Sequence, residues 1–214
     1  MKMRRKTYPK GFTLVELMVA LIVTGIIMSA VATLAFAFST ANDASNDTDR
    51  KQAQVRYATM RLSELIRHCK LICAVNATDL VIWRDDDVPG GEGQINPDEL
   101  VFIETDSRYI RIMEFSNCPS WLTTYLVRLS WLQDTWIKTT LMSYCDEDYV
   151  VVIPECSNVQ FQFDASPPQS QFVSISFDLT ENGITRHYDI DSSLRCWAGH
   201  LIDTAGTDLI TDDD

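Results

Sequence analysis

Residues 11–38 read GFTLVELMVALIVTGIIMSAVATLAFAF, a long apolar segment that contains one acidic residue, Glu16. Within it, Leu17–Phe38 supplies 22 residues without a charge or a proline. As a helix that rises about 1.5 Å per residue, this run spans about 33 Å, close to the thickness of one hydrocarbon core. The segment therefore predicts a single membrane-spanning helix, which we assign to residues 12–38.

The charges on either side of this helix predict its orientation. Residues 1–11 contain no acidic residue, whereas Asp43, Asp47 and Asp49 follow the apolar run. Because positive charge stays on the cytoplasmic side, the N-terminus is expected in the cytoplasm and the body outside the inner membrane. The basic residues that precede the helix are Lys2, Arg4, Arg5, Lys6 and Lys10.

Two ordinary interpretations leave Glu16 unexplained. A cleaved signal peptide would fit the A-x-A sequence Ala35-Phe36-Ala37, but the apolar run exceeds the roughly 7–15 residues of a signal core. A plain retained anchor explains length and orientation. It does not explain an acid at the edge of the helix, which would cost about 2–3 kcal/mol at the membrane centre and less near the interface. Glu16 is therefore a candidate functional residue.

The run Lys10–Leu17 resembles the type III signal sequence of type IV prepilins and pseudopilins. It combines a short basic leader, Gly11 at the cleavage point, Phe12 as the new first residue and Glu16 at the fifth mature position. The resemblance implies that a prepilin peptidase removes residues 1–11 and N-methylates Phe12. A basic leader would hold the precursor against anionic lipid. The resemblance ends near residue 40, so it concerns export and assembly.

The same resemblance implies a role for Glu16 in assembly. A carboxylate in a low-dielectric helix bundle needs an opposite charge, and the amine of Phe12 on a neighbouring subunit would supply one. The alternative is an interfacial residue whose side chain reaches toward water. Many major type IV pilins carry a proline inside this helix, whereas none lies between Pro9 and Pro89 here, which favours a pseudopilin or a minor pilin.

A polar linker and an amphipathic helix are predicted after the membrane segment. Residues 39–49 read STANDASNDTD, and such short polar side chains weaken helix interiors, so we expect a loosened helix or a brief break. Over residues 50–73 apolar positions recur every three or four residues, which predicts a helix with one face against the body. These positions are Val55, Ala58, Leu62, Leu65, Ile66, Cys69, Ile72 and Cys73.

Residues 74–214 form a β-rich body in this interpretation. Short runs of β-branched and aromatic residues predict strands, and Asn182-Gly183 between two of them predicts a hairpin turn. The expected fold class is α+β: a long N-terminal helix packed on an antiparallel sheet, as in pilins. The predicted strands are Leu80–Trp83, Leu100–Glu104, Tyr109–Phe115, Tyr125–Leu132, Thr135–Met142, Tyr149–Ile153, Val159–Phe163, Phe172–Leu179 and Ile184–Ile190.

The C-terminal third carries a second, weaker resemblance. Residues 158–163 read NVQFQF, Pro167-Pro168 follows, and residues 173–177 read VSISF before Ser192–Arg195. This order is similar to that of J-class minor pseudopilins and related minor pilins. Any amphipathic hairpin approximates the pattern.

An even number of cysteines in an exported domain predicts disulfides, although 15 full pairings are possible. Cys69 and Cys73 lie four apart on the predicted helix, so we expect each to pair with a distant partner and at least two disulfides to form. A metal site at His68, Cys69 and Cys73 is the alternative, although paired CxxC spacing is absent from the sequence. The six cysteines are Cys69, Cys73, Cys118, Cys145, Cys156 and Cys196.

The sequence contains no recognisable catalytic motif, and we expect no cofactor, catalytic residue or metal. Asp85-Asp86-Asp87 and Asp146-Glu147-Asp148 offer oxygen ligands to calcium, but solvated loop charge is the simpler interpretation. Five tryptophans suggest a sugar-stacking face, although core packing is favoured in a β-rich body. They are Trp83, Trp121, Trp131, Trp136 and Trp197.

Charge limits the possible partners. The chain carries a net charge of −12, and without residues 1–11 it would keep 13 basic residues against 30 acidic ones, a net −17. So acidic a body argues against nucleic-acid binding. The favoured function is a minor pilin or pseudopilin of a type II secretion or type IV pilus system, with prepilin peptidase and other subunits as partners. The alternative is a glycan- or calcium-binding or enzymatic domain tethered outside the inner membrane by a pilin-type anchor.

Overall fold

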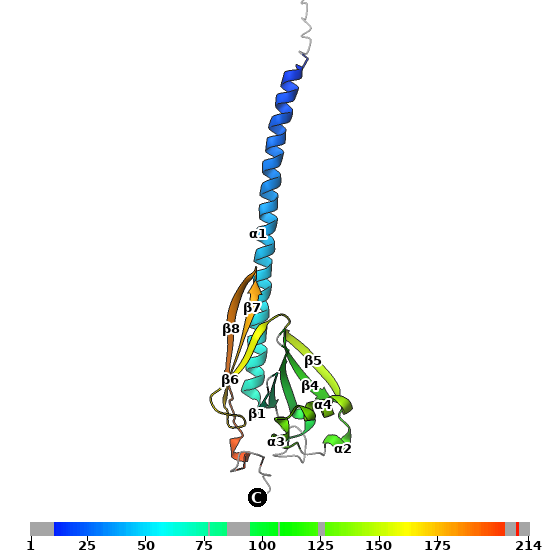
Figure 1. Ribbon diagram of the computed structural model, residues 1–214, viewed down its shortest axis with the longest axis vertical. Coiled ribbons are helices and arrows are strands. Elements are labelled where there is room, and N and C mark those ends of the chain that lie inside the picture. The colour runs from blue at the N-terminus through cyan, green and yellow to red at the C-terminus, as the bar shows by residue number, and fades with distance from the viewer. Residues whose placement is uncertain are drawn as a thin grey trace, which may run out of the picture. The chain divides into compact units, whose positions relative to one another are not determined.

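The computed structural model describes residues 11–76, 78–84, 95–106, 108–123, 127–203 and 209 (Figure 1). The chain divides between Asp47 and Thr48 into two compact units. The basic leader up to Lys10, the loop with Asp85-Asp86-Asp87 and the acidic tail Asp212–Asp214 lie outside the described residues.

Helix α1 extends from Leu14 to His68 and contributes to both units. It is continuous through residues 39–49, so the predicted loosening or break there is wrong for this structure. Asn, Asp and Ser cost only a few tenths of a kcal/mol each in a helix, and a helix that is already formed propagates through them. α1 also ends five residues earlier than predicted, at His68, because the residues that follow enter a strand.

In the part of the chain that the structure describes, eight strands form two antiparallel sheets. The first sheet has the order β1-β2-β3-β4-β5, and the second has the order β6-β7-β8. Seven of the predicted strands are confirmed, with small changes at their ends. The first three residues of β1, by contrast, lie in the segment 50–73 that we predicted as helix. The strands are β1 (Leu71–Val75), β2 (Asp79–Trp83), β3 (Leu100–Thr105), β4 (Ile110–Ser116), β5 (Asp146–Ile153), β6 (Ser157–Phe163), β7 (Phe172–Glu181) and β8 (Ile184–Ser193).

The predicted hairpin at Asn182-Gly183 is confirmed. Glu181 of β7 pairs with Ile184 of β8, which leaves a two-residue loop. Asn182 and Gly183 have φ values of 49° and 77°, and positive φ at both central residues is what a type I′ turn requires. Asn182 Nδ2 also donates a hydrogen bond of 2.9 Å to the Thr48 hydroxyl of α1.

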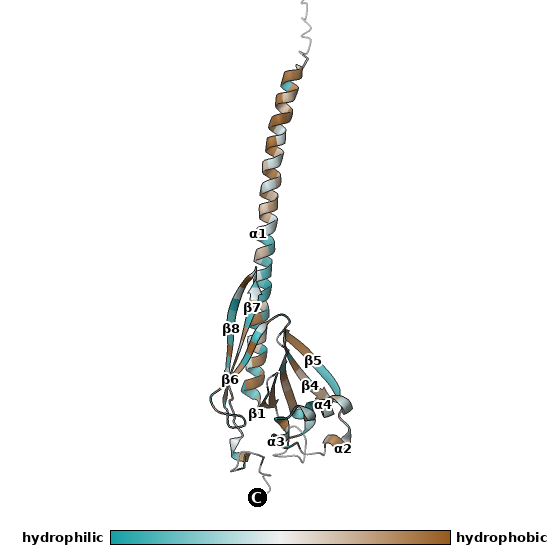
Figure 2. Ribbon diagram, viewed as in Figure 1, coloured by the Kyte–Doolittle hydropathy of each residue, from teal (hydrophilic) through white to brown (hydrophobic). Residues whose placement is uncertain are grey.

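The main core lies between α1 and the two sheets, which confirms the α+β fold class. Within the second unit, α1 buries Ala58, Leu62 and Ile66 completely. These side chains pack in one cluster with residues of both sheets, including Ile103 of β3 and Phe177 of β7. The part of the predicted apolar stripe that lies on α1, up to Ile66, is therefore its packed face. Figure 2 shows this lower part of α1 in alternating teal and brown, in contrast to the mainly brown upper part.

A helical excursion separates β4 from β5. It contains α2 (Ser120–Thr123), α3 (Leu129–Leu132) and α4 (Thr135–Tyr144), so the predicted strands at 125–132 and 135–142 are wrong for the residues described. Ile137 and Leu141, one turn apart on α4, pack in a second core cluster on the other face of the first sheet. Burial of this helical face outweighs the β propensity of the threonines. Two short 3₁₀ turns, Pro97–Glu99 and Gly199–Leu201, complete the described elements.

Candidate functional site

The predicted cleavage junction is open to solvent. Gly11, Phe12 and Thr13 precede the first turn of α1, and the Phe12 side chain is 83% exposed. A peptidase needs such a non-helical segment, since a helix hides its peptide bonds within its own hydrogen bonds. A Cβ added at Gly11 would meet no atom within 4 Å. In the chain by itself, a larger residue could therefore replace Gly11 without a steric clash.

Glu16 closes the N-terminus of α1 through a reciprocal pair of contacts with Thr13. Its Oε2 accepts hydrogen bonds from the Thr13 backbone N–H at 3.0 Å and from the Thr13 hydroxyl at 2.9 Å. The Glu16 N–H donates to the Thr13 hydroxyl oxygen at 3.3 Å. This arrangement is a capping box, and the positive end of the helix dipole also favours a carboxylate there. The T-x-x-E spacing from Thr13 to Glu16 is the sequence signal of this capping box.

The apolar part of α1 has the properties of a membrane segment. It is long and apolar enough to cross a membrane, as the brown colour of this part of α1 in Figure 2 illustrates. None of its apolar window is buried within the structure. Its hydroxyl groups donate to helix carbonyls one turn earlier: Thr24 to Ala20 at 2.8 Å and Thr33 to Ser29 at 2.8 Å. Since lipid offers no hydrogen-bond partner, such internal contacts lower the cost of burying these polar groups in a membrane.

The cysteines form one disulfide, not the two or more that we expected. Cys118 and Cys145 are bonded and lie just beyond the last pair of β4 and β5, so this bond closes the base of the helical excursion. Cys69 follows the end of α1 and Cys73 lies in β1, so they do not share a helix. They pack in different core clusters and are not bonded to each other, and both are free thiols.

The remaining thiols differ in accessibility. Burial raises the pKa of Cys69 to about 12 and that of Cys73 well above its usual range. Cys156 is half-buried and Cys196 is exposed. Among the residues that the structure describes, no group of three or more His, Cys, Asp or Glu side chains is arranged to hold a metal, and His68 is exposed.

We expect four free thiols per unreduced chain and six after reduction. In the folded protein Cys196 should react first with a thiol reagent and Cys156 more slowly. Cys69 and Cys73 should react only on unfolding, because their sulfur atoms are buried and protonated. Thiol titration with and without denaturant measures this order. Two or fewer thiols in the denatured, unreduced chain would contradict the single disulfide.

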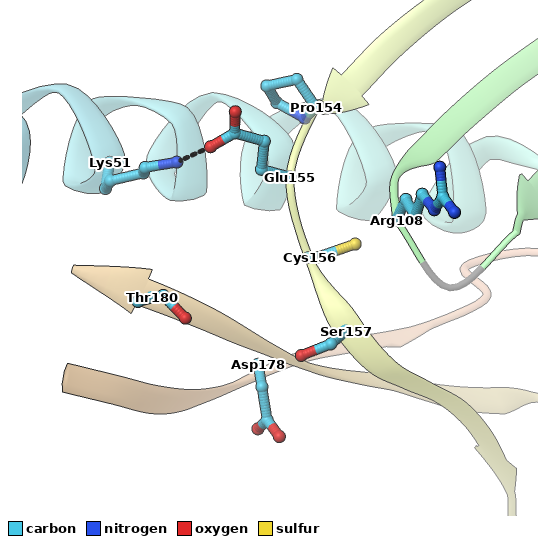
Figure 3. A pocket seen from close by; sticks show the side chains of 8 residues that line it. All are labelled: Lys51, Arg108, Pro154, Glu155, Cys156, Ser157, Asp178 and Thr180. Carbon is cyan, nitrogen blue, oxygen red and sulfur yellow. Dashed lines mark hydrogen bonds and ion pairs between the residues drawn. The ribbon is translucent and has the colours of Figure 1, made fainter. Parts of the chain in front are cut away.

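A hollow of about 470 Å³ lies beside the segment that connects β5 to β6 (Figure 3). Lys51 of α1, which is mostly buried, donates to Glu155 at 2.6 Å across its edge. Cys156 lines the hollow, but burial and, to a lesser extent, the charge of Asp106 raise its thiol pKa to about 11. This thiol is therefore protonated near neutral pH and is a poor nucleophile.

Four titratable residues form an ion-paired group beneath α4. Lys138 donates to Asp79 at 2.8 Å and to Glu104 at 2.7 Å, and Arg111 pairs with the other oxygen of Glu104. These contacts fix α4 on β2 and β3. At the start of β5, Asp146 accepts a hydrogen bond of 3.0 Å from Asn117.

The tryptophans are mostly not core residues, which corrects our expectation. Trp83 is fully buried and donates its indole N–H to Glu99 at 3.0 Å. Trp121, Trp136 and Trp197 are 54%, 46% and 36% exposed. Two of these exposed rings lie on the helical excursion, one on α2 and one on α4.

Comparison with known proteins supports the assignment of the N-terminal segment. Residues 7–32 match a family model described as the prokaryotic N-terminal methylation motif. No curated protein and no solved structure matches the chain. The motif supports a pilin- or pseudopilin-type subunit, processed by a prepilin peptidase and anchored in the inner membrane by its apolar helix. It does not reach residues 158–195, so the resemblance to J-class subunits stays a prediction.

Proposed function

We propose that the chain is a minor pilin or pseudopilin that is anchored in the inner membrane and then built into a type II secretion pseudopilus or a type IV pilus. Cleavage between Gly11 and Phe12 would release the leader, and the new Phe12 amine would be methylated. One observation supports this proposal most strongly. The methylation motif includes the exposed, non-helical residues 11–13, and an apolar helix long enough to span a membrane follows them directly. The leader would lie in the cytoplasm and the body in the periplasm.

The surface of α1 in the second unit also supports a subunit role. The helix face turned away from the sheets exposes Tyr57 by 47% and Met60 by 69%. Exposed Arg56 and Arg61 lie beside them in a chain that is otherwise strongly acidic. An apolar stripe with basic neighbours can pack against the acidic body of another subunit, because opposite charges favour such an encounter.

The mature protein is expected to begin at Phe12. Intact mass and N-terminal sequencing of membrane-extracted protein, from cells with and without the prepilin peptidase, measure this directly. Gly11→Val should block cleavage, because the enzyme and not the free chain requires glycine at this position. A start after Ala37 would restore the signal-peptide interpretation. If the chain stays uncut in cells that contain the peptidase, the apolar helix is a plain, retained membrane anchor.

The second candidate is a ligand-binding domain carried by the same type of anchor. One observation favours it, namely the exposed aromatic side chains of the helical excursion. The buried titratable groups do not favour an enzyme, since Asp79, Glu104, Arg111 and Lys138 are engaged in ion pairs with one another. Assembly into a filament and ligand binding by the body are compatible.

A further inference from the structure

The outer face of α4 carries two aromatic side chains with hydroxyl groups between them. Trp136 and Tyr144 are 46% and 55% exposed and lie eight residues apart, or about 12 Å along the helix axis. Thr139, Thr140 and Ser143 line a hollow of about 500 Å³ together with these two rings. Since the opposite face of α4 is packed in the core, this face cannot turn inward.

The hydroxyl groups of this face are acceptors. Thr139 donates to the Thr135 carbonyl at 3.2 Å, Thr140 to the Trp136 carbonyl at 2.9 Å and Ser143 to the Thr139 carbonyl at 2.8 Å. Each hydroxyl hydrogen is therefore occupied, while lone pairs on the oxygen remain for a donor from outside. A ligand rich in O–H groups is suited to such a row of acceptors.

The two rings are held by their neighbours. Tyr144 makes an edge-to-face contact with Trp121 at 5.1 Å between centroids, and the Cys118–Cys145 disulfide lies beside this pair in the sequence. Trp136 packs against Trp131 at 5.7 Å. Side chains fixed before binding lose little conformational freedom when a ligand arrives, so the face is preorganised.

The chemistry of the face selects among ligand classes. None of the five lining residues carries a carboxylate, an ammonium or a guanidinium group, although the chain as a whole has a net charge of −12. A charged ligand would therefore find no counter-charge among the residues that line the hollow. A sugar ring fits better: its C–H groups stack on the negative face of an aromatic ring, and its hydroxyls donate to acceptors.

We propose that the outer face of α4 binds a neutral polysaccharide, with Trp136 and Tyr144 as stacking platforms and the three hydroxyls as acceptors between them. Because Trp136 and Tyr144 are about 12 Å apart along the helix axis, they can stack sugars that are not adjacent in the polysaccharide, so a polymer binds more tightly than a single sugar. The proposal names the site and ligand class of the second candidate function. It is independent of cleavage and filament assembly, so its failure would leave the pilin-type assignment in place.

The test uses the full chain in a detergent that carries no sugar head group. Amylose, cellulose and chitin serve as neutral probes, and heparin serves as the charged one. We expect retention on at least one neutral polymer, with a change in tryptophan fluorescence on addition of the soluble oligosaccharide of that polymer. Trp136→Ala and Tyr144→Ala should each weaken binding at least tenfold. Thr140→Val, which keeps the side-chain shape, should weaken it several-fold.

The matched control is Tyr149→Ala on β5, which removes a tyrosine of similar exposure (56%) from another surface and should leave binding unchanged. Circular dichroism of each variant checks that the fold is kept. Absence of binding to all three neutral polymers would overturn the proposal. Binding to heparin alone, or parental binding by Trp136→Ala and Tyr144→Ala together, would overturn it as well.

Discussion

Glu16→Gln is expected to lower incorporation into the filament at least tenfold, while membrane insertion and cleavage after Gly11 proceed as in the parent chain. Glutamine is also accepted at the third helical position of a capping box, so this change removes the charge and keeps the helix start. In a filament the carboxylate would pair with the Phe12 amine of a neighbour. A slip of one helical turn, about 5.4 Å, would leave both charges unpaired, so the pair would set the axial register.

The capping contact with Thr13 supplies the control for this experiment. In the single chain the Glu16 carboxylate is bound to the Thr13 N–H and hydroxyl, so assembly must share or exchange these contacts. Thr13→Ala removes the hydroxyl and keeps the charge. It should weaken the first turn of α1 by about 0.5–2 kcal/mol and leave assembly largely intact. Glu16→Asp, with its shorter side chain, should be intermediate.

The measurement is the fraction of subunit recovered with sheared or cross-linked filaments when all partner subunits are present. Normal assembly of Glu16→Gln would show that Glu16 is only an interfacial residue. Equal losses for Thr13→Ala and Glu16→Gln would instead assign the effect to the helix start rather than to the charge pair.

The parts of the structure that could be predicted are those in which local chemistry agrees with the fold. The apolar length of α1, the alternation in β6 and β7, and the positive-φ requirement at Asn182-Gly183 each depend on neighbouring residues alone. The N-terminal motif belongs to this class too, because it is a short linear pattern that the family model matches at residues 7–32, whereas cleavage after Gly11 stays a prediction. For these features one sequence window holds all the necessary information.

The features that were missed depend on contacts between distant residues. Ile72 and Cys73 continue the apolar spacing of α1, but pairing of Leu71 with Trp83 and of Val75 with Leu80 draws residues 71–75 into a sheet. The threonine-rich α4 is a helix because its Ile137 and Leu141 fill a core whose other side is built from distant strands. The disulfide follows from the same excursion, since only the β4–β5 pairing brings Cys118 to Cys145.

Lys138→Met is expected to destabilise the body by about 3–5 kcal/mol, which is the usual cost of removing one partner of a buried ion pair. The Lys138 side chain is 13% exposed, and those of its partners Asp79 and Glu104 are 3% and 14% exposed. Glu104 would keep Arg111, but Asp79 would lose the only cation that pairs with it among the described residues. A buried carboxylate without a counter-charge then opposes folding, and α4 loses its link to β2 and β3.

Low pH should reduce the difference in free energy of unfolding between the parent chain and Lys138→Met. Burial alone would raise the pKa of Glu104, but hydrogen bonds and charge from Arg111 and Lys138 lower it below its usual 4.5. A carboxyl group whose pKa is lower in the folded state stabilises the fold above its unfolded pKa, and this contribution is lost as the pH falls through the folded-state value. The gap between parent and Lys138→Met should therefore be largest near neutral pH and should shrink below about pH 4.5.

Denaturant titration of the full chain in detergent micelles, followed by circular dichroism and by the fluorescence of its five tryptophans, measures both effects. Arg84→Met is the matched control, since it breaks the ion pair of Arg84 with Glu114, whose side chains are 42% and 33% exposed, and should cost less than about 1 kcal/mol. Adding Asp79→Asn to Lys138→Met removes the unpaired charge and should recover part of the lost stability. If Lys138→Met is as stable as Arg84→Met at neutral pH, the ion-paired group beneath α4 does not hold the helical excursion on the first sheet.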